Sequence, residues 1–324
     1  MSVVYYFPKD KYMWDFWLVK RKDLYHIYYL QASRKIQSAD SRHSVASVGH
    51  AVSRDLEIWK EEETVLKAGP AGSWDDVSIW TGTVIEKNGI YYMFYTSTST
   101  KDVGKIQRIG IAISENLYTW EKYKHNPVIE AHPDWYEKAN ISMDGLEHWR
   151  DPFVVYNKED KFYYVFICAR VNYGSHDGRG CIARAKSRDL LDWKVMSPAT
   201  DAGNFYNMEV PDLHFKNGRW YLLFTTCASW YPEKHKREIK PFMPQTGILY
   251  YQSETLLGKF APMDNKEVLL GTDTQSYTAR VIEDIHGNNV VLTWKLKAKG
   301  FEGFAGCLDR PRRLQYMLDG TLKI

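Results

Sequence analysis

The chain has 324 residues, of which 43 are lysine or arginine and 40 are aspartate or glutamate, so its formal net charge is +3. These charges are spread along the chain without a long block of one sign, which argues against nucleic acid or a membrane surface as a partner. No window holds the roughly 18 apolar residues of a membrane-spanning helix, and the amino-terminal residues lack the pattern of a signal peptide. We therefore expect a cytoplasmic protein.

Aromatic residues make up 15% of the chain, including 12 tryptophans and 23 tyrosines. A content this high is typical of strand-rich proteins with sugar-facing surfaces. The cysteines, Cys168, Cys181, Cys227 and Cys307, form no CxxC pair, and no histidine cluster at ligand spacing accompanies them. We therefore expect free thiols, no metal site and no organic cofactor.

Five pairs of short runs rich in β-branched and aromatic residues follow one another along the chain. The runs cover residues 16–19 and 24–31, 81–86 and 90–98, 152–156 and 161–169, 210–215 and 219–226, and 279–283 and 289–294. The two runs of each pair are joined by residues typical of tight turns, so each pair predicts a β-hairpin. No long amphipathic helix and no Pro-, Gly- or Ser-rich linker interrupts the series.

A short motif recurs after four of these hairpins. Its copies are SRDLEIW at 53–59, SENLYTW at 114–120, SRDLLDW at 187–193 and SETLLGKF at 253–260. They lie about 60 to 75 residues apart, which is too far for a solenoid repeat but suits a propeller blade of four short strands. The fifth hairpin has no copy, as expected if the last blade closes the ring with the chain ends.

The repeats predict an all-β fold, a single five-bladed β-propeller in which residues 1–324 form one catalytic domain. Five blades take roughly 65 residues each, which leaves no room for a second domain. The alternative is a two-sheet sandwich, a fold that does not need a repeat of this length.

The first strand of each blade lines the central channel of a propeller, so residues at its start face one cavity. Three of the five starts carry an acid: Asp15, Asp151 and Glu209. Taken singly, each acid also fits a turn or an exposed strand. Together they fit glycosidic cleavage, which uses a carboxylate and a protonated carboxyl on either side of the bond. Arg150 is placed to hold Asp151 ionised or to bind a hydroxyl, and Asp212 to tie a loop through backbone hydrogen bonds.

Several motifs resemble those of glycoside hydrolase family 32 and the related family 68, the fructofuranosidases, invertases and levansucrases. VGHAVSRDLEIW at 48–59 is similar to the family's WGHAxSxDLxxW, WRDPFV at 149–154 to its RDP motif and MEVPDL at 208–213 to its ECPDL motif. Near the end of the chain, YTA at 277–279, VVLTW at 290–294 and DRPRRL at 309–314 resemble the closing segments of the family. The matches follow the family's order along nearly the whole chain.

The resemblance implies that Asp15 is the nucleophile, Glu209 the general acid/base and Asp151 the transition-state stabiliser. The implied reaction is a retaining hydrolysis of β-fructofuranosides or related furanosides. The expected partner is therefore a small carbohydrate, either a disaccharide or an oligosaccharide. The residues expected to bind it are Trp14, Gln31, Trp80, Arg150, Tyr277 and Trp294, with Trp17 joining Trp14 as a stacking platform.

Two departures from the family pattern bear on these expectations. The family's first motif, WMNDPNG, is here MWDFWLV at 13–19, so Asp15 is identified by its position before a predicted strand. The sequence also stops soon after the closing segment, without the carboxy-terminal β-sandwich of family 32.

Two other functions fit the same residues. One is an inverting arabinofuranosidase or xylosidase of the related family 43. A separation of about 6.5 to 9.5 Å between the carboxyls of Asp15 and Glu209 would indicate inversion, and about 5 to 5.5 Å retention. The other is a sugar-binding propeller without catalytic activity, which would bind furanosides and leave them intact.

Overall fold

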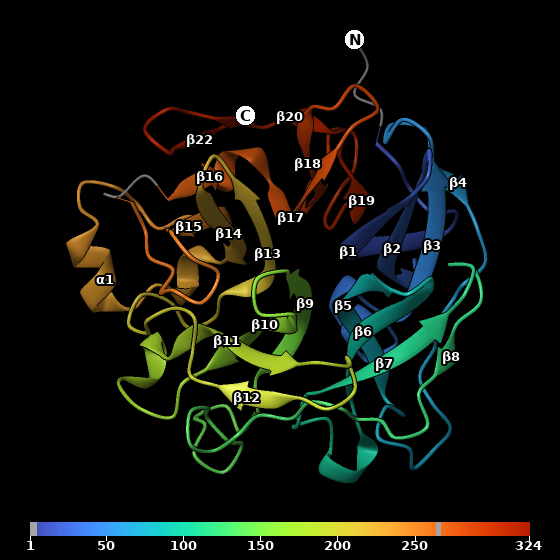
Figure 1. Cartoon of the computed structure of the whole chain (residues 1–324), viewed down its shortest axis with the longest axis horizontal. Coiled ribbons are helices and arrows are strands. Elements are labelled where there is room, and N and C mark those ends of the chain that lie inside the picture. Colours follow the sequence, from blue (N-terminus) through green and yellow to red (C-terminus); the bar gives the residue numbers. More distant parts are fainter. Residues whose placement is uncertain (1–4, 264–266) are drawn as a thin grey trace.

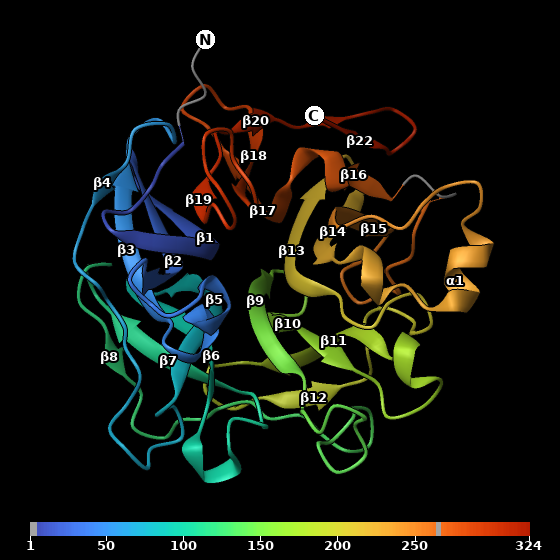
Figure 2. The same cartoon turned by 180° about the vertical axis from the view of Figure 1, so that it is seen from behind.

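The backbone forms five antiparallel β-sheets arranged in a ring (Figure 1). The structure, a computed structural model, describes residues 5–263 and 267–324. Seen from behind, the sheets follow one another around the ring in sequence order, from blue to red (Figure 2). This arrangement confirms the predicted all-β, five-bladed β-propeller. The predicted domain, 1–324, also includes residues 1–4 and 264–266, which lie outside the described residues.

Each blade begins with an inner strand that contacts the inner strand of the next blade, and the fifth inner strand contacts the first. The inner strands are β1 (Lys11–Arg21), β5 (Ser78–Lys87), β9 (Trp149–Asn157), β13 (Glu209–Lys216) and β17 (Ser276–Glu283). The second strands are β2 (Leu24–Ser33), β6 (Ile90–Thr98), β10 (Phe162–Arg170), β14 (Arg219–Thr226) and β18 (Asn289–Lys295). These ten strands form the five hairpins that the sequence predicts.

The remaining strands complete the blades toward the outside of the ring. The third strands are β3 (Ser47–Ser53), β7 (Arg108–Ser114), β11 (Gly180–Ser187), β15 (Gly247–Ser253) and β19 (Cys307–Leu308). The outer strands are β4 (Lys60–Glu61), β8 (Glu121–Lys122), β12 (Lys194–Met196) and β16 (Val268–Leu270), and β20 (Arg312–Arg313) pairs with β18. A separate hairpin consists of β21 (Gln315–Tyr316) and β22 (Leu322–Lys323).

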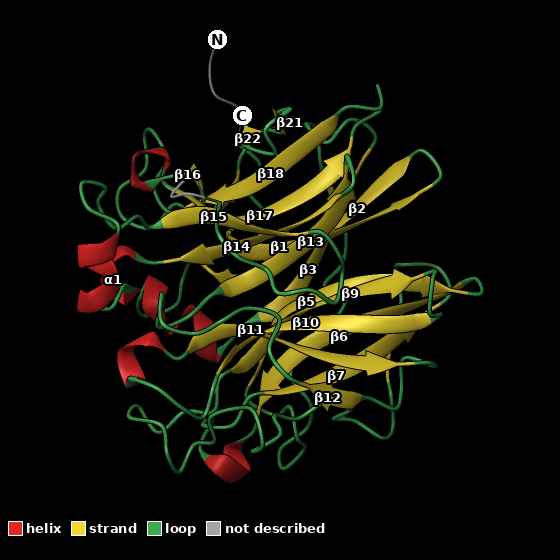
Figure 3. Cartoon of the chain, turned by 60° about the vertical axis from the view of Figure 1, so that its left-hand side comes forward, coloured by secondary structure: helices red, strands yellow, loops and turns green. Residues whose placement is uncertain are grey.

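Helical segments are short. They are α1 (Glu233–Glu238) and the 3-10 helices η1 (Ala39–Ser44), η2 (Thr100–Asp102), η3 (His176–Gly178), η4 (Ala228–Trp230) and η5 (Thr272–Thr274). Figure 3 shows most of them on the side of the molecule opposite the hairpin turns of the long strands. Within residues 5–263 and 267–324, no helix has the length and apolar character to cross a bilayer.

Apolar side chains pack between neighbouring blades. One cluster joins Met13 and Tyr28 of the first blade to Met93 of the second and Leu292 of the fifth. Further clusters fill the spaces between the second and third, third and fourth, and fourth and fifth blades. Because each sheet is covered on both faces, its middle strands are almost continuously apolar or aromatic.

The repeated motif is the turn from the third strand of a blade to its fourth. In the first three copies, the serine Oγ accepts a hydrogen bond from the leucine N–H three residues later, at 2.9 Å. The leucines of these copies, Leu56, Leu117 and Leu190, have φ values of 66°, 72° and 77° and are buried. The motif thus turns the chain and anchors a side chain in the core, so its role is structural.

The ring is closed by the two ends of the described chain. Tyr6 N donates to Leu308 O at 3.1 Å, and Leu308 N donates to Tyr6 O at 3.0 Å. Leu308 belongs to β19, so the segment before β1 extends the fifth blade. Figures 1 and 2 both show the red fifth blade beside the blue first blade. This pairing explains why the fifth hairpin lacks the repeated motif.

Candidate active site

Every inner strand carries a β-bulge near its start. In β1 the pairing with β2 shifts between Trp14 and Phe16, and the other inner strands show an equivalent shift. The first bulged residue in each inner strand, in chain order, is Asp15, Thr81, Asp151, Val210 and Thr278. Bulges interrupt the regular alternation of a strand and re-aim its side chains. In all five blades, the regular pairing of the inner strand with the second strand is therefore interrupted near the start of the inner strand, where its side chains face the axis.

A cavity of about 490 Å³ lies where these strands begin. Its volume suits a small organic ligand. The residues immediately before the bulges all line it, and these are Trp14, Trp80, Arg150, Glu209 and Tyr277. Asp15, Thr81 and Asp151 from the bulges line it as well. Three acids from three different blades thus share one cavity.

Asp15 is held by side chains from the two neighbouring blades. Its Oδ1 accepts hydrogen bonds from Thr278 Oγ1 at 2.6 Å and from Trp294 Nε1 at 3.0 Å. Its Oδ2 accepts from Thr81 Oγ1 at 3.1 Å. Three donors on one carboxylate fix its direction, which is what an attacking group requires.

Asp151 is the most deeply buried of the three acids, with 3% of its surface exposed. Its Oδ2 accepts a hydrogen bond from Val210 N at 3.1 Å. Val210 is the first residue of the bulge in β13 and adopts φ 50°, which is unusual for a β-branched residue. The N–H that binds Asp151 therefore belongs to the bulge. Burial raises the pKa of Asp151 to about 7, with the charges of Glu209 and Asp15 adding to the effect and Arg150 opposing it.

Glu209 is held at both oxygens by neighbours that donate hydrogen bonds. Arg150 Nη2 donates to Oε1 at 2.6 Å, and Tyr277 OH donates to Oε2 at 2.5 Å. Burial raises the pKa of Tyr277 well above its usual value, and the charge of Glu209 adds to the effect, so the phenol stays a donor. The side chain of Glu209 is 18% exposed, so this acid remains open to the cavity.

The structure brings together all the predicted site residues except Gln31 and Trp17. Leu30 lines the cavity, and because side chains alternate along a strand, Gln31 points away from it. Its Nε2 instead donates to Thr64 Oγ1 at 2.8 Å. Trp17 is also outside the cavity, where it stacks on Tyr28 in the core at a centroid distance of 6.2 Å. The expectation that Trp17 forms a stacking platform is therefore wrong.

Asp212 has the structural role that the sequence predicts. Its Oδ2 accepts a hydrogen bond from Val281 N at 3.0 Å, which ties β13 to β17. Arg280 lies 3.6 Å from its Oδ1 and donates to Pro211 O at 2.6 Å. Burial raises the pKa of Asp212 to about 6, although Arg280 opposes the shift.

The cavity walls also include side chains that the sequence analysis missed. His43 comes from η1, Gln107 and His148 from the segments before β7 and β9, and Tyr206 and Trp230 from the segments flanking β13 and β14. Most of these lie in irregular segments with no periodic pattern. Only His148 had a signal, because it immediately precedes the WRDP motif. Burial lowers the pKa of His43 to about 4, so this imidazole is neutral at neutral pH.

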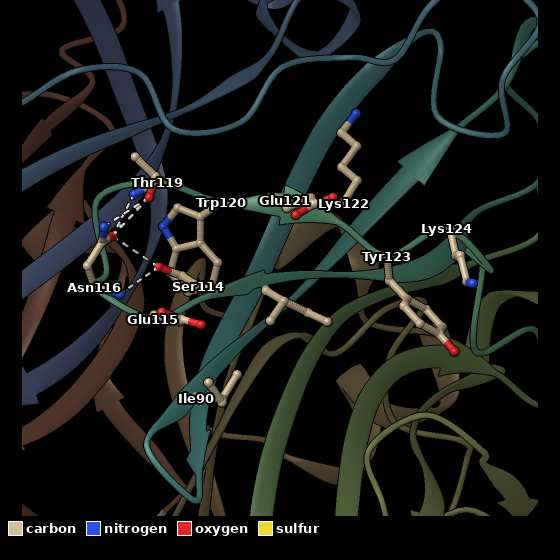
Figure 4. A pocket seen from close by; sticks show the side chains of 11 residues that line it. Ile90, Ser114, Glu115, Asn116, Thr119, Trp120, Glu121, Lys122, Tyr123 and Lys124 are labelled. Carbon is tan, nitrogen blue, oxygen red and sulfur yellow. Dashed lines mark hydrogen bonds between the residues drawn. The ribbon is translucent and has the colours of Figure 1, made fainter.

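A second cavity, of about 610 Å³, lies on the outer part of the second blade (Figure 4). Ser114, Asn116 and Trp120 of the repeated motif line it, together with residues of β8. Figure 4 shows the hydrogen bonds by which Asn116 organises this turn. None of the predicted site residues lines this cavity. In the part of the chain that the structure describes, no group of three or more His, Cys, Asp or Glu side chains is arranged to hold a metal ion.

The family model of the glycosyl hydrolases family 32 N-terminal domain matches residues 7–322. The chain belongs to glycosyl hydrolase family 32. The match spans all five blades, so the resemblance noted in single motifs extends through the whole propeller of this family 32 chain.

Curated relatives of the family 32 chain include two proteins named sucrose-6-phosphate hydrolase. The one from Zymomonas mobilis is 24% identical over 291 residues, which cover 82% of this chain and 51% of that protein. The one from Bacillus subtilis is 24% identical over 311 residues, which cover 90% of this chain and 58% of that protein. The family 32 chain thus spans little more than half the length of these relatives.

Solved structures share the fold. Inulosucrase from Halalkalicoccus jeotgali, bound to kestose, superposes with a TM-score of 0.77 at 18% identity, covering 98% of this chain and 89% of that one. Fructan 1-exohydrolase IIa from Cichorium intybus superposes with a TM-score of 0.72 at 19% identity, covering 99% of this chain and 59% of that one. The family 32 chain therefore has the propeller of these proteins.

Proposed function

We propose that this family 32 chain hydrolyses β-fructofuranosides with retention of configuration, and that residues 1–324 act as one catalytic domain. The observation that carries the proposal is the convergence of Asp15, Asp151 and Glu209 on one cavity, each in a different environment. A retaining glycosidase needs two carboxyl groups with separate roles, and different environments are what separate them.

In the first step, Asp15 attacks the anomeric carbon of the fructosyl unit while Glu209 gives a proton to the leaving oxygen. The glycosidic bond breaks, an ester bond forms to Asp15, and the leaving group departs as an alcohol. In the second step, Glu209 takes a proton from water, the water oxygen attacks the anomeric carbon, and the ester bond to Asp15 breaks. Both acids then return to their starting states. The three hydrogen bonds to Asp15 support its role as the nucleophile.

Asp151 binds sugar hydroxyls and stabilises the positive charge that develops on the ring in the transition state. Its burial supports this role for the ionised form, because a buried carboxylate interacts strongly with a nearby positive charge. Trp14, Trp80 and Trp294 supply apolar walls against which the C–H faces of a sugar pack.

The substrate in this proposal is a disaccharide or short oligosaccharide such as sucrose, sucrose 6-phosphate or a fructan oligomer. Two findings support it: membership of family 32, and the names of the curated relatives. We also propose a cytoplasmic location, which is supported by the four cysteines, all of which carry free thiols.

A substrate panel tests the proposal. The purified protein is incubated with sucrose, sucrose 6-phosphate, inulin oligomers, levan and aryl arabinofuranosides or xylosides, and the anomer first released is followed by NMR. We expect hydrolysis of a fructofuranoside with retention, abolished by Asp15→Asn and by Glu209→Gln. Inversion, or activity on arabinosides or xylosides only, would show a family 43-like enzyme. Binding without hydrolysis would show a sugar-binding propeller.

A further inference from the structure

His148 lies between a carboxylate on the loop before β9 and the arginine that holds Glu209. Its Nε2 is 2.8 Å from Asp144 Oδ2, and its Nδ1 is 2.8 Å from Arg150 Nη1. The same guanidinium donates to Glu209 Oε1 through Nη2 at 2.6 Å. His148 is only 6% exposed, so both of its ring nitrogens are engaged within the protein. A continuous chain of hydrogen bonds thus leads from Asp144 to Glu209.

The proton positions along this chain follow from its chemistry. A guanidinium has only donors, so His148 Nδ1 must accept from Arg150 and cannot carry a proton. The single ring proton therefore sits on Nε2 and is donated to Asp144. Hydrogen bonds from His148, Ser142 and Tyr206 lower the pKa of Asp144 although burial opposes them, so this acceptor is ionised.

The groups around His148 favour its neutral form. Burial lowers the pKa of His148, and Arg150 and Arg170 act in the same direction, while Asp144 opposes them. The ring of Tyr206 covers it edge-on at a centroid distance of 5.9 Å. A neutral imidazole with its proton on Nε2 is the one form that can accept from Arg150 and donate to Asp144 together.

We propose that His148 is a positioning residue, which fixes the guanidinium of Arg150 in the orientation that aligns Glu209 with the leaving-group oxygen. This inference rests on the proposed function, because it requires Glu209 to act as the general acid. Arg150 Nη1 has a second acceptor, Gln107 Oε1, but at 3.3 Å. Without the bond to His148, the contacts of the guanidinium besides Glu209 are longer, such as 3.3 Å to Gln107 Oε1 and 3.6 Å from Nε to Asp151 Oδ2, so its orientation toward Glu209 is held less firmly.

Two substitutions each keep one of the two hydrogen bonds of His148 and remove the other. His148→Asn places Oδ1 close to the former Nδ1, so it can still accept from Arg150 but does not reach Asp144. His148→Gln places its terminal amide close to the former Nε2, so it can still donate to Asp144 but leaves Arg150 without this acceptor. The two variants are matched in chemistry and differ in which partner they retain.

The test compares sucrose with 4-nitrophenyl β-fructofuranoside, whose leaving group departs with little help from an acid. We expect His148→Gln to lower kcat/KM, which reports the first step, by about 10-fold or more on sucrose and much less on the aryl substrate. We expect His148→Asn to keep kcat on both substrates within about three-fold of the wild type. Thermal melting of each variant checks that it is folded.

Three results would overturn the inference alone, provided that the wild type hydrolyses these substrates. They are a wild-type kcat/KM on sucrose in His148→Gln, an equal loss of kcat/KM on both substrates, and a His148→Asn variant as impaired as His148→Gln. A wild-type protein that hydrolyses no β-fructofuranoside of the substrate panel would overturn the proposed function, and this inference with it. If it hydrolyses another natural fructofuranoside of the panel, that compound replaces sucrose in the comparison.

Discussion

Asp151 makes the stability of the folded protein depend on pH in a direction that one substitution can reveal. Burial, with the charges of Glu209 and Asp15, raises its pKa from 3.8 to about 7, although Arg150 opposes the shift. Between about pH 4 and pH 7 the folded protein therefore keeps a proton that the unfolded chain has lost. Because the folded state binds more protons in this window, the free energy of unfolding falls as the pH rises through it.

The size of this effect follows from the shift. A difference of about three pH units corresponds to roughly 4 kcal/mol at 1.36 kcal/mol per unit. Of this, roughly 3 kcal/mol is lost between pH 5 and pH 8. Asp151→Asn preserves the shape of the side chain and an oxygen that can accept from Val210, but it cannot ionise. We therefore expect the variant to lack this pH-dependent loss of stability, and to lose activity as well.

Reversible urea unfolding of both proteins at pH 5, 6, 7 and 8 measures the effect. The free energy of unfolding of Asp151→Asn minus that of the wild type should increase by roughly 3 kcal/mol over this range. Other groups that titrate here, such as Asp212, are present in both proteins, so their contributions largely cancel in the difference. Parallel curves for the two proteins would refute the reasoning.

Three further substitutions test single contacts. Thr278→Val removes the 2.6 Å bond to Asp15 and should lower kcat by about 10-fold or more at an unchanged Tm. Tyr277→Phe removes the 2.5 Å bond to Glu209, so initial rates should fall more on sucrose than on an aryl fructofuranoside. Gln31→Ala should lower the Tm but leave KM within about two-fold, since this amide lies outside the cavity. A wild-type kcat in either of the first two, or a raised KM in the third, would contradict these placements.

The sequence predicted the fold well because the signals of a propeller are local and repeated. The turn built on Ser53 and Leu56 recurs with the same hydrogen bond in the second and third blades. The turn residues of each hairpin also mark where its two strands meet, so the start of each inner strand could be located from the sequence. Asp151 and Glu209 were found in this way, and Asp15 despite its altered surroundings.

The prediction was less complete for residues whose direction depends on strand geometry or on loops. Gln31 and Trp17 lie on strands next to residues that do face the cavity, and only the pairing between β1 and β2 shows which way each side chain points. His43 and Trp230 reach the cavity from the short 3-10 helices η1 and η4, where no spacing in the sequence indicates direction. Tertiary structure alone brings them to the cavity.

The junction between the first and fifth blades has a consequence for how the protein loses function on warming. Asp15 lies on β1, whereas Thr278 and Trp294, which hold its Oδ1, lie on β17 and β18. A small separation of the first and fifth blades would loosen the hydrogen bonds that hold Asp15, the proposed nucleophile, while every sheet stayed intact. On heating, activity would then fall before the far-ultraviolet circular dichroism spectrum changes. Loss of activity would therefore detect the opening of the ring earlier than loss of β-structure does.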